Sequence, residues 1–442
     1  MPDDSIARPT NVRTRVFALA CGASFLLYLH RYTWNFVGPK LEDDYHLTKT
    51  QVTFLFSLFY YTYAAGQIPS GVVIDRFGPH KYLSIIVVAW SAAMAVIGAT
   101  SNLVLLGLSR LLFGAAQAGC YPSLTKVTRS WFPANRRTVI QGWIATTFGR
   151  AGGAMSPIIL GTVLMGWCGL SWQTSLQLLG LIGLVFGFVF WRTFKNTPGE
   201  HPGVNHEERA LIEKGTNSTT SSQTALPMSR ALKSRDLRFF AVQQFLDAGS
   251  DVAFVALIGT FFLKARGFDI AKAGWLTSLP LWGGALGGIA GGWLNDYLIH
   301  RTGSRRWSRS GVGFVGKLIG CVLLLFVVRQ ENGAAAALFL MAAKFFSDWS
   351  QPTTWGMSTD LGGRYSATVF SVINTAGTLG GVVMPIVFGE ILDRFTTKAL
   401  VNGQAIATTN WAPLFVLLAG MYLASGLCWL LVNCTRSLDV EA

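Results

Sequence analysis

Long apolar runs separated by shorter polar segments follow one another along almost the whole chain. The runs are 19 to 29 residues long, and about 20 apolar residues rising ~1.5 Å each are enough to cross the ~30 Å hydrocarbon core of a bilayer. The pattern therefore predicts an all-α membrane protein with 12 transmembrane helices. We place these spans at residues 16–38, 51–73, 82–100, 102–127, 137–165, 172–194, 237–264, 271–298, 311–329, 334–358, 365–392 and 410–433.

A polar stretch between the sixth and seventh runs divides the chain. We expect an N-terminal six-helix half at residues 1–194, a cytosolic connector at 195–236 and a C-terminal six-helix half at 237–442. Within the connector, several turn residues precede a short helix with acidic and basic residues around Glu207–Lys214.

Two motifs occur once in each half. Gly152-Gly153-x-x-x-Pro157-x-x-x-Gly161 returns 228 residues later as Gly380-Gly381-x-x-x-Pro385-x-x-x-Gly389, and Gly71-x-x-x-Asp75 returns 221 residues later as Gly292-x-x-x-Asp296. Such repeats are typical of transporters in which two halves of parallel topology are related by an axis along the membrane normal. We therefore expect two pseudo-symmetric halves with a solute site near the membrane midplane.

Composition and charge agree with a multi-pass membrane protein. The chain is 51% hydrophobic and 13% charged, whereas soluble domains average about 25% charged residues. Of its 36 Lys and Arg residues, 23 fall on the side of the N-terminus, 8 on the other side and five inside spans. This asymmetry predicts a plasma (inner) membrane protein with both termini in the cytosol. Because the net charge of +14 is not gathered in a basic tract with interleaved aromatics, we expect no nucleic-acid partner.

The sequence lacks the features that are typical of metal-binding proteins, nucleotide-binding proteins and enzymes. The six cysteines are scattered through apolar segments without metal or disulfide spacing. The sequence shows no nucleotide-binding loop, no metal-ligand cluster and no Ser/His/Asp set at a plausible depth. We expect a monomer with no enzymatic activity, no cofactor and no metal, embedded in the lipid bilayer.

Five basic residues lie inside apolar spans, where a charge costs several kcal/mol unless water, a partner or an anion compensates it. They are Arg31, Arg110, Arg150, Lys317 and Lys344. A guanidinium presents a planar fork that matches a carboxylate in two hydrogen bonds. We interpret Arg31 as a charge in a central cavity that binds an anionic solute, the alternative being an arginine that reaches toward the membrane surface.

The loop after the second span carries a recognisable motif. Gly71-Val-Val-Ile-Asp75-Arg76-Phe-Gly78-Pro-His-Lys81 resembles the signature loop of the major facilitator superfamily. The resemblance implies that Gly71, Asp75 and Arg76, with Asp296 of the repeated motif, take part in gating rather than in solute binding. We also expect the glycines of this motif to let two helices approach closely.

Further motifs resemble one branch of that superfamily, the anion:cation symporter family. They are Tyr28-Leu-His30-Arg31, Gln67-Ile-Pro69-Ser-Gly71, Arg110-x-x-x-Gly114-x-x-Gln117-Ala-x-x-x-Pro122, Arg129-Ser-Trp131-Phe132-Pro133 and Asn374-Thr-Ala-Gly377-x-x-Gly380-Gly381. The resemblance covers nearly the whole chain. It implies proton- or sodium-coupled transport of a small organic anion by alternating access, with spans 1, 4, 7 and 10 lining the cavity. It favours a sugar acid of the hexuronate, galactonate or glucarate type.

Two positions depart from this family's pattern. The family usually has Asp before the arginine of span 1 and Glu seven residues after the arginine of span 4, where this chain has His30 and Gln117. Those two carboxylates are the family's usual proton carriers. The departure keeps open an uncoupled or exchange-type transporter of organic anions or organophosphates.

Acidic residues elsewhere offer a replacement for the missing carriers. Asp247 and Asp251 are four residues apart in span 7, so both carboxylates lie on one face of the helix. Asp348 follows Lys344 by four residues in span 10 and is able to pair with it. We predict ion coupling by Asp247, Asp251 and Asp348, with His30 as a second titrating group; the alternative for the aspartates is a set of static salt bridges.

The solute-binding candidates combine basic, amide and aromatic groups. They are Arg31, Tyr63, Arg110, Gln117, Lys344, Trp355 and Asn374; the resemblance supports Tyr63 and Asn374 in particular. Two other functions remain as alternatives. A drug exporter is disfavoured because intramembrane cations repel cationic drugs, and a transporter-like nutrient sensor is disfavoured by the short tails.

Overall fold

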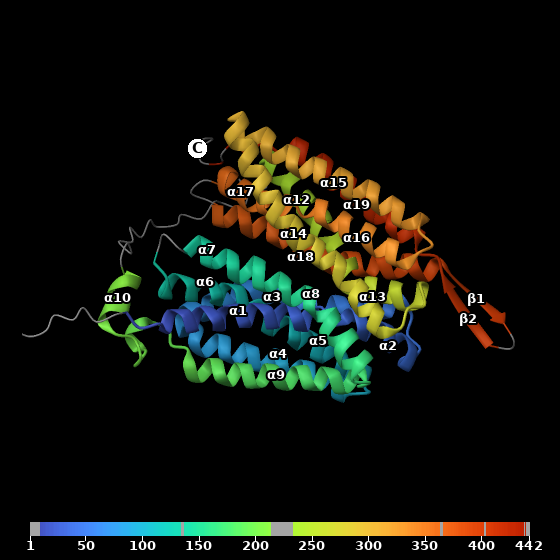
Figure 1. Cartoon of the computed structure of the whole chain (residues 1–442), viewed down its shortest axis with the longest axis horizontal. Coiled ribbons are helices and arrows are strands. Elements are labelled where there is room, and N and C mark those ends of the chain that lie inside the picture. Colours follow the sequence, from blue (N-terminus) through green and yellow to red (C-terminus); the bar gives the residue numbers. More distant parts are fainter. Residues whose placement is uncertain are drawn as a thin grey trace, which may run out of the picture. The chain divides into compact units, whose positions relative to one another are not determined.

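The computed structural model describes residues 9–133, 137–213, 233–362, 366–401, 404–436 and 438, and these are mostly helical (Figure 1). The chain forms two compact units. The first unit comprises Met1–Arg31, Tyr61–Gly153 and Gln173–Ser221, and the second comprises Tyr32–Tyr60, Ala154–Trp172 and Ser222–Ala442. We describe each unit by itself.

The first unit contains expected spans 3 and 4, nearly all of span 6, parts of spans 1, 2 and 5, and the first part of the connector. Its elements are α1 (Val12–Arg31), most of α3 (Lys49–Phe77), α4 (Pro79–Ala99), α5 (Leu103–Ala118), α6 (Cys120–Trp131), α7 (Arg137–Gly142), the π-helical η2 (Trp143–Phe148), the start of α8 (Gly149–Pro157), α9 (Trp172–Thr193), the short η4 (Pro198–Glu200) and α10 (His206–Glu213). The acidic helix expected in the connector is α10.

The second unit contains the C-terminal helices together with the remaining pieces of earlier spans. Its elements are α2 (Trp34–Tyr45), the start of α3, the π-helical η3 (Ile158–Trp167), α12 (Arg235–Ala256), α13 (Ile258–Thr260), η5 (Phe261–Ala265), α14 (Ile270–Thr302), α15 (Arg305–Arg329), α16 (Gly333–Ser347), α17 (Ser350–Gly362), α18 (Ser366–Arg394), β1 (Thr396–Val401), β2 (Gln404–Thr409) and α19 (Ala412–Leu431). The two strands form an antiparallel hairpin in which Thr396 pairs with Thr409. We did not predict this hairpin.

Each expected span coincides with one helix or with consecutive helices. Among the residues that the structure describes, eight helices are long and apolar enough to cross a membrane, and nine if the bent pair Arg235–Ala256 and Ile258–Ala265 is one span. The break in that pair bends the chain by 42° at Leu257. Other expected spans include broken helices such as α16, which has only 15 residues before the chain turns.

Spans 1, 4, 7 and 10 are all interrupted in their second half. The interruptions lie at residues 32–33 between α1 and α2, at Gly119 between α5 and α6, at Leu257 between α12 and α13, and at residues 348–349 between α16 and α17. Transporters commonly form solute and ion sites at such discontinuous helices, where backbone groups leave the regular ladder. The four breaks therefore indicate where to search for functional groups.

Helix starts and helix contacts repeat between the halves. Asn102 caps α5 by accepting from two backbone N–H groups, and Asn332 caps α16 in the same way, as asparagine does at many helix N-termini. A Cβ atom on Gly152 would collide with the carbonyl oxygen of Phe25, and one on Gly380 with the carbonyl oxygen of Phe245. The repeated glycine motif thus packs span 5 against span 1 and span 11 against span 7 in equivalent ways.

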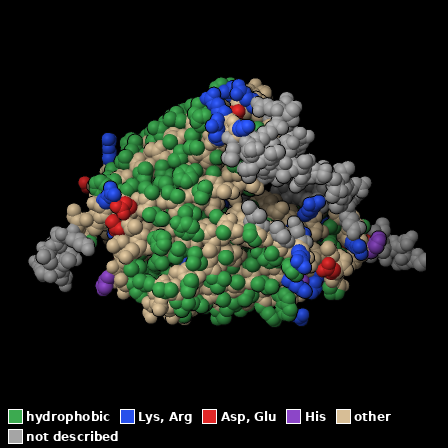
Figure 2. Space-filling view, turned by 180° about the vertical axis from the view of Figure 1, so that it is seen from behind, with side chains coloured by type: hydrophobic (Ala, Val, Ile, Leu, Met, Phe, Trp, Pro, Cys, Tyr) green, Lys and Arg blue, Asp and Glu red, His purple; other side chains and the backbone are tan. Residues whose placement is uncertain are grey.

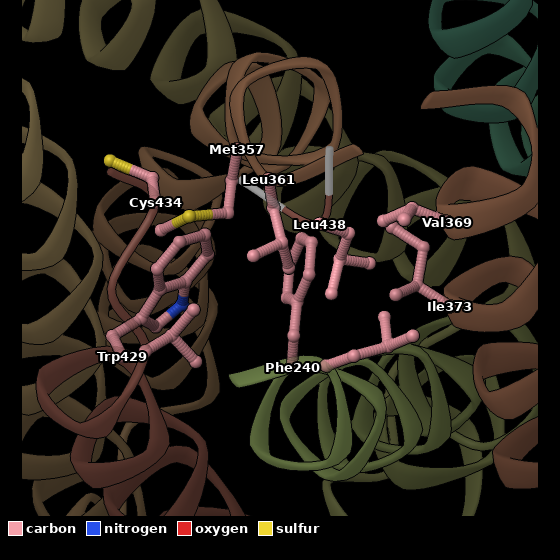
Figure 3. Packing of buried hydrophobic residues seen from close by; sticks show 10 residues of the cluster. Phe240, Met357, Leu361, Val369, Ile373, Trp429, Cys434 and Leu438 are labelled. Carbon is pink, nitrogen blue, oxygen red and sulfur yellow. The ribbon is translucent and has the colours of Figure 1, made fainter. Parts of the chain in front are cut away.

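A compact apolar cluster closes one end of the second unit (Figure 3). Phe240 of α12 packs against Trp429 of α19, with ring centroids 5.8 Å apart. The rest of the cluster comprises Leu237, Met357, Leu361, Val369, Ile373, Val432, Cys434 and Leu438. On the outside, many large apolar side chains are exposed, and Figure 2 shows them covering much of one face. An exposed apolar surface of this extent is what a lipid-facing protein requires.

The connector holds the start of α1. Glu208 of α10 is buried, and its carboxylate accepts hydrogen bonds from the backbone N–H groups of Val12 (3.2 Å) and Arg13 (3.0 Å) and from the hydroxyl of Thr10. A carboxylate at this place satisfies N–H groups that lack partners inside the helix and interacts favourably with the positive end of the helix dipole.

Candidate solute and ion-coupling sites

Arg31 is the last residue of α1, directly before the break in span 1. Its side chain is only 9% exposed, and its Nε–H donates a hydrogen bond of 3.0 Å to the Gln117 side-chain oxygen. The Gln117 amide nitrogen in turn donates to the backbone carbonyl of Leu27 at 3.3 Å. The neutral amide of α5 therefore orients the guanidinium and also binds the helix that carries it.

Two tyrosine rings also lie against Arg31. The guanidinium carbon lies 4.8 Å from the ring centroid of Tyr63 and 5.1 Å from that of Tyr28, within the range of a cation–π interaction. The Tyr28 ring contacts Tyr121 edge to face, and the Tyr121 hydroxyl lies 2.9 Å from that of Ser24. The structure thus brings together three of the predicted solute-binding residues, Arg31, Tyr63 and Gln117, and adds Tyr28 and Tyr121.

Arg110 and Arg150 are the other basic residues of the first unit that were expected inside spans. Arg110 is buried on α5, two turns before Gln117, with its guanidinium carbon 5.6 Å from the Phe113 ring. Seven residues of helix separate Arg110 from Gln117 by about 10 Å along the axis. Arg150 is half-buried on α8.

His30 lies in the packing between helices. Its ring is buried against Gly183 of α9, where a Cβ atom would also touch Ser91 of α4. The His30 ring therefore contacts α9, whereas the side chain of the neighbouring Arg31 contacts α5 and α3. This placement gives His30 a packing role and provides no support for its predicted role in ion coupling.

Lys344 in the second unit binds two carboxylates at once. Its ammonium group lies 2.6 Å from a carboxylate oxygen of Asp251 and 2.5 Å from one of Asp348. Asp348 is the C-terminal cap of α16, so the group sits at the break of span 10. The pairing of Lys344 with Asp348 that the four-residue spacing suggested is present, and Asp251 of α12 joins it.

A second buried ion pair lies beside this one. Lys317 of α15 contacts the carboxylate of Asp247 and donates a hydrogen bond of 2.6 Å to the hydroxyl of Ser347. The other carboxylate oxygen of Asp247 accepts from the Gln351 amide at 3.1 Å. Lys317 is one of the five basic residues expected inside spans, but no role is predicted for it from the sequence. The signal in the sequence is a charge in the middle of an apolar run, since the other charge of residues 311–329, Arg329, lies at the end of that run.

Two further candidates come from α17 and α18. The Trp355 side chain of α17 is 55% exposed and stacks on Phe370 at 4.4 Å between ring centroids. Asn374 of α18 is half-buried, and its backbone carbonyl accepts from the Thr378 hydroxyl at 2.9 Å. Their predicted roles in solute binding stay predictions.

The comparison with known proteins decides the family. The family model described as Major Facilitator Superfamily matches residues 20–385, which is most of the chain. The chain belongs to this superfamily. The predicted all-α fold of two related halves is confirmed, and the protein is a multi-pass membrane transporter rather than an enzyme.

Several major facilitator proteins resemble this chain along nearly their whole length. It is 28% identical over 412 residues to the probable sulfoacetate transporter SauU of Cupriavidus necator, covering 92% of this chain and 94% of that one. It is 26% identical over 404 residues to the probable galactarate/D-glucarate transporter GudP of Bacillus subtilis, covering 87% of each. It is 25% identical over 428 residues to the D-galactonate transporter of Escherichia coli, covering 94% and 97%.

Solved major facilitator structures share the fold. A bacterial homologue of the human lysosomal transporter Spinster, inward-facing and unoccupied, superposes with a TM-score of 0.74 at 16% identity over 96% of this chain and 94% of that one. The nucleoside transporter NupG superposes with a TM-score of 0.68 at 14% identity over 95% and 98%.

The signature loop of the superfamily is only partly described. The side chain of Asp75 lies outside the described residues, and Arg76 is exposed with its guanidinium carbon 5.5 Å from the Phe77 ring. A Cβ atom on Gly71 would meet nothing within 4 Å, so the expected close helix approach is wrong at this glycine. In the repeated motif, Asp296 is exposed and accepts from the Asn295 amide at 3.2 Å.

Proposed function

We propose that the protein is a secondary transporter for a small organic anion, with sugar acids of the hexuronate, galactonate or glucarate type as the first candidates. The observation that carries the proposal is the buried Arg31, held by Gln117 and flanked by the rings of Tyr28 and Tyr63. A guanidinium at the break of a transmembrane helix is a costly group, and an anionic solute compensates its charge.

The chemistry of this group suits a hydroxylated carboxylate. The planar guanidinium forms two parallel hydrogen bonds to one carboxylate. Tyrosine hydroxyls and the Gln117 amide supply donors and acceptors for hydroxyl groups. The names of the relatives support this class, since sulfoacetate, glucarate and galactonate are all small acids.

Coupling to an ion is the second part of the proposal. The anion:cation symporter family usually carries protons on two carboxylates, and this chain has His30 and Gln117 in their places. We therefore assign ion coupling to the aspartates around Lys344. An uncoupled or exchange mechanism is the alternative that Gln117 favours. The Lys and Arg asymmetry supports a plasma-membrane protein with both termini in the cytosol, and we propose that it acts as a monomer.

The test is transport by purified protein in liposomes. Labelled galactonate, glucarate, glucuronate and sulfoacetate are offered with and without imposed pH and sodium gradients. We expect Arg31→Gln to lower kcat/KM for the transported anion by about 30-fold or more, because removing one partner of a buried charge pair costs 2 kcal/mol or more. Arg31→Lys keeps the charge but not the fork and should recover only part of the loss.

Arg394→Gln is the matched control, since Arg394 is an exposed arginine paired with Glu390 on α18. It should transport like the wild type. Uptake by Arg31→Gln equal to that of the wild type would exclude Arg31 as the anion-binding group, and no uptake of any of the four anions by the wild type would refute the solute class.

A further inference from the structure

Five ionisable side chains of the second unit lie together, and we call them the charge cluster. It consists of the buried Asp247, Lys317, Lys344 and Asp348 and the partly exposed Asp251. When all are ionised, these five side chains carry three negative and two positive charges. Protonation of one carboxylate makes the two numbers equal, and unequal charges are expensive in a buried environment.

Within the charge cluster, Asp247 and Lys317 form a balanced pair. Both side chains are buried, and each has a second polar partner: Ser347 for Lys317 and Gln351 for Asp247. A pair whose charges and hydrogen bonds are matched is costly to break and gains nothing from a further cation. Its role is to fix α12 against α15 and α16.

The other three side chains of the charge cluster are one ammonium and two carboxylates, so their charges do not cancel. The ammonium of Lys344 lies between the carboxylates of Asp251 and Asp348, at 2.6 and 2.5 Å. Asp348 is buried, whereas the side chain of Asp251 is 32% exposed. Asp251 is therefore the more accessible of these two carboxylates.

We propose that Asp251 binds the transported proton, with Asp348 and Lys344 as its partners, while Asp247 and Lys317 stay a neutral positioning pair. The inference rests on the proposed transport function and names the ion and the residue that carries it. A proton from water on the open side adds to a carboxylate oxygen of Asp251, and Lys344 keeps Asp348 as its counter-ion. Release of the same proton on the other side restores the shared pair.

The geometry favours a proton over a metal cation. A hard metal cation needs several oxygen ligands around one point, and the Lys344 ammonium already occupies the point between these two carboxylates. The groups that act on Asp251 are Lys344 and Asp348 from span 10, Asp247 from its own helix and Tyr422 from α19. A proton needs only one carboxylate oxygen, so it fits this arrangement.

The first experiment needs no solute. Infrared difference spectra of the purified protein are recorded on acidification, following the carbonyl stretch of a buried protonated carboxyl. We expect this band in the wild type and in Glu390→Gln, a control at an exposed carboxylate of α18, and its loss in Asp251→Asn. A band that persists in Asp251→Asn but disappears in the charge-neutral double variant Asp247→Asn/Lys317→Met would overturn the proposal.

The second experiment measures coupling. A monovalent anion moved with one proton accumulates about tenfold per pH unit of gradient, because one pH unit is worth 1.36 kcal/mol. We expect Asp251→Asn to lose this accumulation while retaining solute counterflow, which needs no net proton movement. Asp348→Asn tests the same site should Asp251→Asn fail to fold. Unchanged pH-driven accumulation in either folded variant would overturn the proposal, whereas a wild type that moves no anion would refute only the proposed function.

Discussion

The carboxylate of Asp393 at the end of α18 binds Thr50 at the start of α3. It accepts a hydrogen bond of 2.8 Å from the Thr50 backbone N–H and one of 2.7 Å from the Thr50 hydroxyl. The N–H of Lys49 donates to the same carboxylate at 3.0 Å. Asp393 thus caps a helix far away in the sequence. Shortly before Lys49 in the chain, Glu42 and Asp43 pair with Lys264 at 3.0 and 2.7 Å. By the orientation proposed here, all of these contacts lie on the extracellular side.

Loss of the Asp393 cap should loosen the start of α3 from the end of α18. Removing an N-cap costs about 1 kcal/mol, so Asp393→Ala should raise the population in which this contact is broken by roughly fivefold. Distances between spin labels on His46→Cys and Asn410→Cys, in a Cys168→Ser background, report the change. Glu390→Gln, at an exposed acid of the same helix, should leave the distances unchanged; an unchanged distribution in Asp393→Ala would show that the cap does not hold the two helix ends together.

Introducing a carboxylate at position 117 should interfere with anion binding. In Gln117→Glu, the new carboxylate would lie at the place where the amide oxygen accepts from Arg31 at 3.0 Å, and would compete with the solute for the guanidinium. We expect KM at neutral pH to rise about tenfold, the effect of 1.4 kcal/mol, and to fall again on acidification as the carboxyl is protonated. Gln67→Glu, on α3, controls for an added charge. A KM that does not depend on pH in Gln117→Glu would contradict this account.

Removing the connector carboxylate should loosen the first turn of α1. Glu208 accepts from the N–H groups of Val12 and Arg13, so Glu208→Gln should weaken both bonds by about 1 kcal/mol. Hydrogen exchange at the start of α1 should accelerate several-fold relative to Glu207→Gln, which changes the neighbouring acid of α10. Equal exchange in the two variants would mean that α1 begins independently of the connector.

The native cysteines provide a test of orientation. Cys168, between η3 and α9, is exposed, whereas Cys434 after α19 is buried. Burial also raises the pKa of the Cys434 thiol, which lowers the fraction of reactive thiolate at neutral pH. We expect a membrane-impermeant maleimide to label intact cells at Cys168 and to leave Cys434 unlabelled in inverted vesicles. Cys168→Ser should abolish labelling, and labelling of Cys168 only in inverted vesicles would reverse the proposed orientation.

The positions of the spans could be read from the sequence because apolar runs of membrane length leave few alternatives. The repeated glycine motif was also a reliable guide, since Gly152 and Gly380 make equivalent helix contacts. The helix breaks were not foreseen. A glycine such as Gly119 is only weak evidence for a helix break, and Leu257 is an ordinary apolar residue. These breaks therefore depend on packing between helices, which the local sequence does not show.

In the candidate site, the sequence could predict only contacts between charged residues that lie three or four positions apart on one helix. Lys344 and Asp348 are four residues apart, and their contact followed from that spacing. The contact between Lys317 and Asp247 joins helices 70 residues apart, and no periodicity encodes it. Likewise, the sequence places His30 beside Arg31 but does not reveal that helix rotation turns its ring toward Gly183.

The pair of Asp247 and Lys317 also constrains how the protein is made. Because chains are synthesised from the N-terminus, the ribosome completes α12 with its aspartate well before α15 delivers the lysine 70 residues later. An isolated aspartate in hydrocarbon is costly, so α12 gains a stable place in the bilayer only when α15 arrives beside it. Assembly of this region therefore follows a fixed order, in which a late helix secures an earlier one.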